Sequence, residues 1–203
     1  MEYLILGFFT GLSLILAIGA QNIFVIEQGL KKQHIFLVCL VCSLSDLILI
    51  FLGIFLFHYF IQYFNSVIEL TLNILLIIFL FHFIYSKIKI YNSSIKLNDK
   101  SQAISKYNIL LKTLGFTYLN PHVYSDTVFF LGNFSKNFLI NEKINFGLGA
   151  AIASFLFFFL IGYLSKYFSK FAENDKVWKI INTFIIIFMS LLTLFIILDT
   201  FIS

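Results

Sequence analysis

The chain has little charge, a single proline, two cysteines and no arginine. Charged residues make up 12% of its 203 positions and hydrophobic residues 60%, whereas a soluble domain is about a quarter charged and half apolar. This composition excludes an ordinary soluble domain, and the long apolar runs predict an all-α membrane protein, because a spanning helix needs about 20 mostly apolar residues.

The absence of other sequence motifs narrows the possible functions of the protein. Cys39 and Cys42 fall in one hydrophobic run and provide no secreted disulfide framework. The net charge of +4 comes from lysines in the loops between spans, so it does not indicate a nucleic-acid partner. We find no phosphate-binding glycine loop, no zinc-type His-Glu-x-x-His and no Ser-His-Asp arrangement. These absences predict that the protein is not an enzyme and holds no cofactor or metal.

The hydrophobic pattern predicts six transmembrane helices. We expect the first span to be retained, because the N-terminus lacks the basic segment and cleavage site of a signal peptide. Twelve of the fourteen lysines fall in the first, third and fifth connections. The positive-inside rule places those connections in the cytoplasm and both termini outside. The expected spans are residues 3–26, 35–60, 67–86, 113–133, 145–165 and 178–201.

The long third connection divides the chain into two halves. Residues 1–86 are predicted to form one three-helix repeat and residues 113–203 a second, joined by a lysine-rich cytoplasmic linker at 87–112. Three spans per half give the halves opposite orientations, which is the inverted-repeat architecture of many secondary transporters. Within the linker, residues 101–112 are compatible with either a short amphipathic helix or an irregular segment.

The first span of each half is interrupted by polar or helix-breaking residues, so we expect broken first and fourth helices. Such breaks are tolerated where they line a cavity enclosed by protein. Proline has no N–H and disturbs the residue before it, so the backbone should open near the only proline. N–H groups at the start of a half-helix attract an anion such as a carboxylate. The interrupting residues are Gly19, Gln21 and Asn22 in the first span and Asn120, Pro121 and His122 in the fourth.

Two of these residues have an alternative interpretation. Gly19 is also compatible with close helix packing, and His122 with helix capping or packing. His122 and Asp126 are four residues apart and share a helix face if the helix resumes after Pro121.

Two acidic residues lie within the expected spans. Asp46 is in the middle of the second span, on one helical stripe with Cys39, Cys42 and Gly53. Asp126 follows the proline break. An intramembrane carboxylate is costly unless it faces the bundle interior, and it commonly handles ions or substrates, although a purely structural role for Asp46 is the alternative. Burial favours the protonated acid and a nearby cation favours the carboxylate, so the pair predicts exchange of a proton for a cationic substrate.

Three motifs in order resemble the lysine/arginine exporter family along the whole chain. They are GLSLILAIGAQNIFVIEQGL (11–30), VCSLSDLILIFLG (41–53) and LGFTYLNPHVYSDTVFFLG (114–132). The resemblance implies a multi-pass exporter of basic amino acids in a bacterial inner membrane, driven by the membrane potential or by protons. Related exporters of neutral amino acids usually carry a Pro-Gly-Pro form of the first motif. By this resemblance, the expected site residues are Gln21, Asn22, Asp46, Asn120, Pro121 and Asp126.

Two other functions stay open at this point. Cys39 and Cys42 have the Cys-x-x-Cys spacing of a membrane thiol–disulfide carrier, although small packing residues are the favoured interpretation. Two intramembrane acids are also compatible with export of a metal cation, and the fold with export of a neutral amino acid.

Overall fold

The computed structural model describes residues 1–16, 19–63, 66–92, 105–172 and 174–201, and these residues are largely helical. Four helices are long and apolar enough to cross a membrane, within the described ranges: 35–57, 66–86, 140–167 and 176–198. The pair α1 (Glu2–Ile15) and α2 (Ala20–Leu30) forms a fifth candidate if it is counted as one broken span. The prediction of an all-helical membrane protein is confirmed.

The remaining elements follow the predicted segments with shifted ends. The helix bounds are α3 (Ile35–Tyr63), α4 (Ser66–Asn92), α5 (Lys106–Tyr118), α6 (Pro121–Tyr124), the π-helical turn η2 (Ser125–Phe130), α7 (Leu131–Phe134), α8 (Ile140–Ala172) and α9 (Asp175–Phe201). The expected fourth span is therefore divided among α5, α6, η2 and α7. Residues 93–104 of the predicted linker lie outside the described residues, as does the first part of segment 101–112.

Apolar stripes cover the outside of the bundle. On α8 the stripe has a spacing of four residues, which places its side chains on one helix face. These leucine and isoleucine side chains are between 40% and 65% exposed. Such a face is suited to lipid contact, since water would not solvate it. The stripe consists of Leu148, Ile152, Leu156, Leu160 and Leu164.

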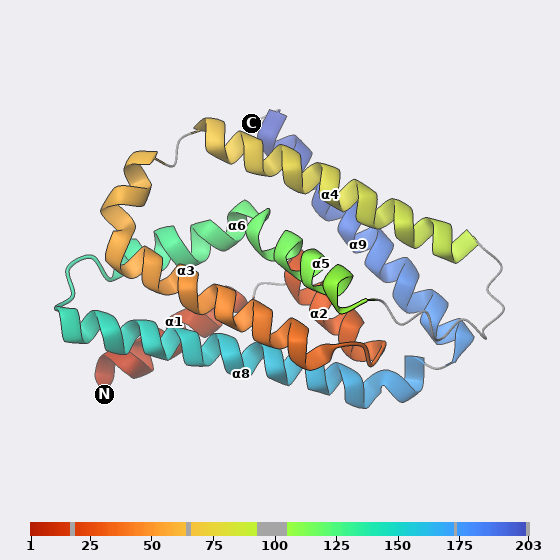
Figure 1. Ribbon diagram of the computed structural model, residues 1–203, viewed down its shortest axis with the longest axis horizontal. Helices are drawn as coiled ribbons and strands as arrows, with labels where there is room; N and C mark the ends of the chain where they lie inside the picture. The colour runs from red at the N-terminus through yellow and green to blue at the C-terminus, as the bar shows by residue number, and fades with distance from the viewer. Residues whose placement is uncertain (17–18, 64–65, 93–104, 173, 202–203) are drawn as a thin grey trace.

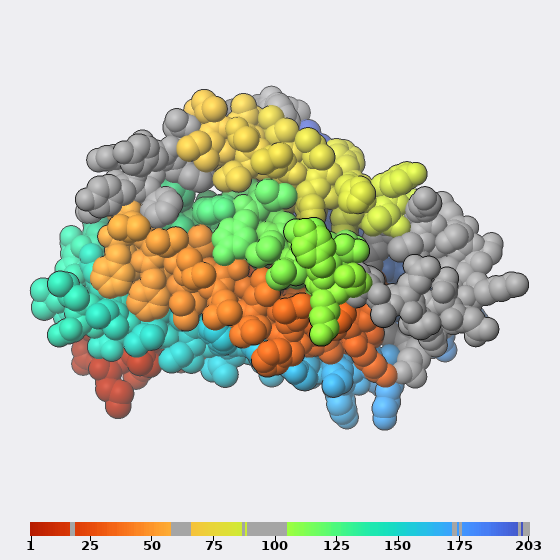
Figure 2. Space-filling view, viewed as in Figure 1, coloured from red at the N-terminus to blue at the C-terminus, as the bar shows by residue number. Residues whose placement is uncertain are grey.

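The helices pack in a reciprocal pattern. The first-half elements α1 and α2 pack against α8, while the second-half elements α5, η2 and α7 pack against α3. The remaining large contacts pair α3 with α8 and α4 with α9. In Figure 1, α4 and α8 run from left to right, whereas α3 and α9 run from right to left. On the face shown in Figure 2, α5 and α6 lie between α3 and α4.

Glycines allow close backbone contacts within this reciprocal packing. A methyl group on Gly29 of α2 would lie 2.5 Å from the carbonyl oxygen of Gly162 on α8. One on Gly132 of α7 would lie 2.7 Å from the carbonyl oxygen of Gly53 on α3. Small residues let helix backbones approach closely in membranes. Both α2 and α7 thus approach a long helix of the other half at a point where each helix has a glycine.

Candidate functional site

The first break turns the chain sharply. The axes of α1 and α2 differ by 83°. Gly19, the residue before α2, is extended, and no side chain caps the start of α2. A Cβ atom on Gly19 would meet nothing within 4 Å. The alternative of close helix packing at Gly19 is therefore wrong, and this glycine borders open space.

The first turn of α2 presents hydrogen-bond donors to the break. The first backbone hydrogen bond of α2 runs from the Ile23 N–H to the Gly19 carbonyl, so the N–H groups of Ala20 and Gln21 have no intrahelical acceptor. The Gln21 side chain is 6% exposed, and its Nε2 makes no hydrogen bond within the described part of the chain. The Cys42 thiol, a weak acceptor, lies beside it.

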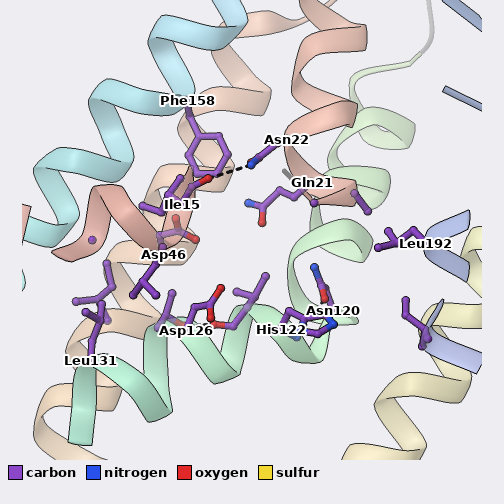
Figure 3. Close-up of a pocket in the computed structure, with 18 residues that line it drawn as sticks. Ile15, Gln21, Asn22, Asp46, Asn120, His122, Asp126, Leu131, Phe158 and Leu192 are labelled. Atoms are coloured by element: carbon purple, nitrogen blue, oxygen red, sulfur yellow. Dashed lines mark hydrogen bonds between the residues drawn. The ribbon is translucent and has the colours of Figure 1, made fainter. Parts of the chain in front are cut away.

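Asn22 holds the two sides of the first break together. Its Nδ2 donates to the Ile15 carbonyl at 3.1 Å, so it satisfies one of the carbonyls left over where α1 ends. The dashed line in Figure 3 marks this bond. Asn22 therefore supports the break structurally and also lines the space beside it.

The second break is built differently. Pro121 occupies the first turn of α6, a position where its missing N–H costs nothing. The Asn120 Oδ1 accepts a hydrogen bond from the His122 N–H at 3.1 Å, so this helix start is capped by a side chain. The chain then widens into the π-helical turn η2, which contains Asp126. Single π turns in helices are often found at functional sites.

Asp46 lies near the middle of α3 and is 3% exposed. The Ser154 hydroxyl of α8 donates to its Oδ2 at 2.7 Å. Asp126 is close enough to interact with Asp46 electrostatically, and His122 interacts with Asp126 in the same way. Cys39, Cys42 and Gly53 are also buried, which confirms that this stripe of α3 faces the bundle interior.

One cavity joins the two breaks. Its volume is about 370 Å³, near the lower end of ordinary small-ligand pockets, which hold about 300–1,000 Å³. Figure 3 shows the side chains of Gln21, Asp46 and Asp126 around a shared space, with Asn120 and His122 on one side of it. The predicted residues that line the cavity are Gly19, Gln21, Asn22, Asp46, Asn120, His122 and Asp126.

Pro121 is the predicted site residue that is not part of this lining. It is buried and fixes the start of α6, so its contribution to the cavity is through the backbone. Apolar residues complete the wall, and none of the lining residues is a lysine. The cavity therefore presents two carboxylates and no fixed ammonium group.

Sequence reasoning missed the partner of Asp46 and the apolar part of the wall. The sequence around Ser154 carries no sign of a bond to a residue 108 positions away. The apolar lining comes from α1, α2, α3, α6, α7, α8 and α9 and includes Phe158 and Leu192. Nothing distinguishes these residues from the many other apolar residues of the spans.

The alternative functions of the sequence analysis concern the two cysteines and a metal ion. Cys39 and Cys42 are free and buried, and the Cys39 thiol donates to the Phe158 carbonyl at 3.2 Å. Among the described residues, no group of three or more histidine, cysteine or acidic side chains is placed to hold a metal ion.

An interrupted, apolar helix bundle around an acidic cavity is the arrangement expected of a membrane translocator. Residues 12–200 match the family model of the LysE type translocators. Since this match covers most of the chain, the protein belongs to the LysE-type translocator family.

Individual relatives give more detail. The chain is 35% identical over 133 residues to the Aeromonas hydrophila protein named "Putative amino-acid transporter YggA". It is 33% identical over 136 residues to the arginine exporter protein ArgO of Salmonella typhimurium. The matched regions cover 65% and 66% of this chain and 59% and 64% of those two relatives. No solved structure matches the chain.

Proposed function

We propose that the protein exports basic amino acids, lysine or arginine, across the cytoplasmic membrane by secondary-active transport. The observation that carries this proposal is the cavity between the two breaks, which combines Asp46 and Asp126 with no lysine in its lining. Two carboxylates in one small cavity favour a cation, because each lowers the energy of a positive group nearby. The ArgO relatives, named as arginine exporters, support the same substrate class.

The two breaks would bind different charged groups of the substrate. The Gln21 Nε2 and the N–H groups of Ala20 and Gln21 are donors suited to an α-carboxylate. Asp126 and Asp46 are acceptors suited to the side-chain ammonium or guanidinium. The α-ammonium would lie beside Asn120 and His122 at the second break.

We also propose that residues 1–86 and 113–203 are inverted repeats joined by a cytoplasmic linker at 87–112. The reciprocal packing of each broken segment on the long helix of the other half supports this division. The glycine pairs Gly29–Gly162 and Gly53–Gly132 support it independently. Rocking of one half against the other would then expose the cavity to each side in turn.

Transport needs a driving force, and a cationic substrate can take it from the membrane potential or from protons. Moving one positive charge across 100 mV is worth about 2.3 kcal/mol. A buried acid that takes up a proton when the cation leaves would couple the two fluxes. Asp46 is the better placed of the two acids for this role, because it is 3% exposed and accepts one hydrogen bond from Ser154.

The test is export from cells loaded with a lysine- or arginine-containing dipeptide. Asp46→Asn and Asp126→Asn should each lower the export rate by roughly 30-fold or more, since removing one partner of a desolvated charge interaction costs about 2–5 kcal/mol. Glu69→Gln is the matched control, because Glu69 is an exposed acid on α4, and its export should be normal. The amount of each variant in the membrane is measured alongside.

Two results would contradict the proposal. Normal lysine and arginine export in both aspartate variants would remove the acidic cavity as the site. Export of a neutral amino acid or of a metal cation in preference to lysine and arginine would assign the protein to another substrate class.

A further inference from the structure

A second, buried charge cluster lies at the lysine-rich end of the molecule, on the helix that begins at the first break. Glu27 of α2 is 1% exposed and forms an ion pair with Lys31, the residue that follows the end of α2. The Lys31 Nζ lies 5.9 Å from the centroid of the Trp178 ring on α9. Lys112 of α5 interacts electrostatically with both Glu27 and Lys31.

An aromatic layer separates this cluster from the cavity. It consists of Phe24, Phe79, Phe83 and Phe116, whose ring centroids are between 4.8 and 6.5 Å apart in the contacting pairs. Along α2 the order from the break is Gln21, Phe24, Glu27. On α5 the order away from the other break is Phe116 and then Lys112. The ion pair is therefore beyond the aromatic layer, and Glu27 and Lys31 do not line the cavity.

The surroundings of the Lys31 ammonium are those of a bound cation. A carboxylate on one side and an indole ring on another are groups with which proteins recognise ammonium and guanidinium ions. On the same turn of α2, Gln28 is 2% exposed, and its Oε1 accepts no hydrogen bond from any described residue. The site thus contains acceptors suited to a cation, and one of them is occupied by the chain's own lysine.

Packing alone does not explain a buried ion pair. Replacing such a pair with apolar residues of similar volume is often neutral or stabilising, because both charges lose their hydration. Lys31 is the first residue after α2, and its side chain is 23% exposed. A long, partly exposed lysine at a helix end can move its ammonium into water at small cost. Glu27 is much less exposed and stays within the bundle.

We propose that Glu27 is a second cation-binding site, at which the side-chain cation of a basic amino acid replaces the Lys31 ammonium before the substrate passes the aromatic layer. This inference rests on the proposed function and extends it. Lys31 neutralises Glu27 when the site holds no substrate and competes with the substrate for it. The positive-inside rule places this end in the cytoplasm, where an exporter takes up its cargo.

If Lys31 competes with the substrate for Glu27, removing Lys31 should lower the apparent KM. A purely structural ion pair predicts no such decrease. The experiment measures the export rate of lysine and arginine against their internal concentration. Lys31→Met should lower the apparent KM by at least about fivefold, the lower end of ordinary coupling between ligands. Glu27→Gln should raise the KM, and the double variant should behave like Glu27→Gln. Lys32→Met removes a neighbouring exposed lysine and is the matched control, with an unchanged KM.

A second variant keeps the test decisive if Lys31→Met fails to accumulate in the membrane. Lys31→Arg retains the ion pair, and its planar guanidinium binds a carboxylate through two parallel hydrogen bonds. A stronger competitor should raise the KM for both substrates. A structural ion pair predicts no change in KM for Lys31→Arg, and it predicts loss of activity in each single removal with recovery in the double variant. Either of those structural results would overturn the inference.

The wild-type protein separates this inference from the proposed function. If the wild type exports neither lysine nor arginine, the proposed function is wrong, and the Glu27 site for its substrate is wrong with it. If the wild type exports them but Lys31→Met does not lower the KM and Lys31→Arg does not raise it, then the Glu27 site alone is wrong.

Discussion

The two helix breaks resemble one another in sequence position but differ in chemistry. At the first, α2 begins after an extended glycine with no side-chain cap, and Gln21 adds a buried donor. At the second, the Asn120 side chain caps the helix start, and Asp126 follows within the next two turns. The first break therefore offers donors, whereas the second has one of its donors occupied and offers a carboxylate.

This difference shows how two similar interruptions can bind an asymmetric molecule. An amino acid with a cationic side chain has a carboxylate at one end and a positive charge at the other. Donors at one break and acceptors at the other would fix its direction in the cavity, because reversing it would place like charges together. A cavity with identical breaks would leave both directions equal in energy.

The largest effect that separates the breaks is expected at Gly19. A Cβ there meets nothing within 4 Å, so Gly19→Ala should fold normally and retain most of its export. Gly19→Leu should extend a side chain into the cavity and reduce lysine and arginine export to background. Export rate and membrane abundance measure this. Background export in Gly19→Ala at normal abundance would show that the backbone at Gly19, and not the space beside it, is what transport requires.

A smaller and more selective effect is expected at Gln21. If its Nε2 binds the α-carboxylate, Gln21→Leu should raise the KM for lysine about tenfold, since a charge-assisted hydrogen bond is worth roughly 1.5 kcal/mol or more. Competition by cadaverine, which is lysine without its carboxylate, should be unchanged in the same variant. Equal weakening of lysine and cadaverine would contradict the assignment of the carboxylate to the first break.

The smallest effect is expected at Cys39 and Cys42 of α3, which lie between the two breaks in the sequence. Both thiols are free and buried, and serine is close to cysteine in size. The Cys39→Ser/Cys42→Ser double variant should export lysine and arginine at the wild-type rate, because the proposed cycle involves no redox step. Loss of export at normal membrane abundance, together with sensitivity of the wild type to thiol oxidation, would favour the thiol–disulfide carrier instead.

Much of the candidate site could be predicted, because a carboxylate or a proline within an apolar helix costs free energy and therefore stands out in the sequence. Asp46, Pro121 and Asp126 interrupt long apolar runs, where a carboxylate or a proline needs a particular reason to persist. Periodicity also placed Cys39, Cys42 and Asp46 on one inward face. Four of the six predicted spans agree with long helices to within several residues at most ends, whereas the first and the fourth are divided into shorter helices.

Other parts of the site could not be predicted, since they depend on contacts between distant helices. The Ser154 hydroxyl reaches Asp46 from a helix more than a hundred residues away. Lys31 and Trp178 are likewise brought together only when α2 packs beside α9. Nothing in the sequence distinguishes Glu27, because an acid near the end of an apolar run is usually solvated.

The sequence by itself determined that this chain is a helical membrane protein with two interrupted apolar segments and two acids within its apolar segments. Those properties follow from hydropathy and backbone chemistry, which act over one helix at a time. The tertiary structure decided that the first break faces open space, that a side chain caps the second, and that a buried ion pair lies beyond an aromatic layer. Burial and hydrogen-bond partners depend on which helices meet, and no local pattern in the chain encodes that.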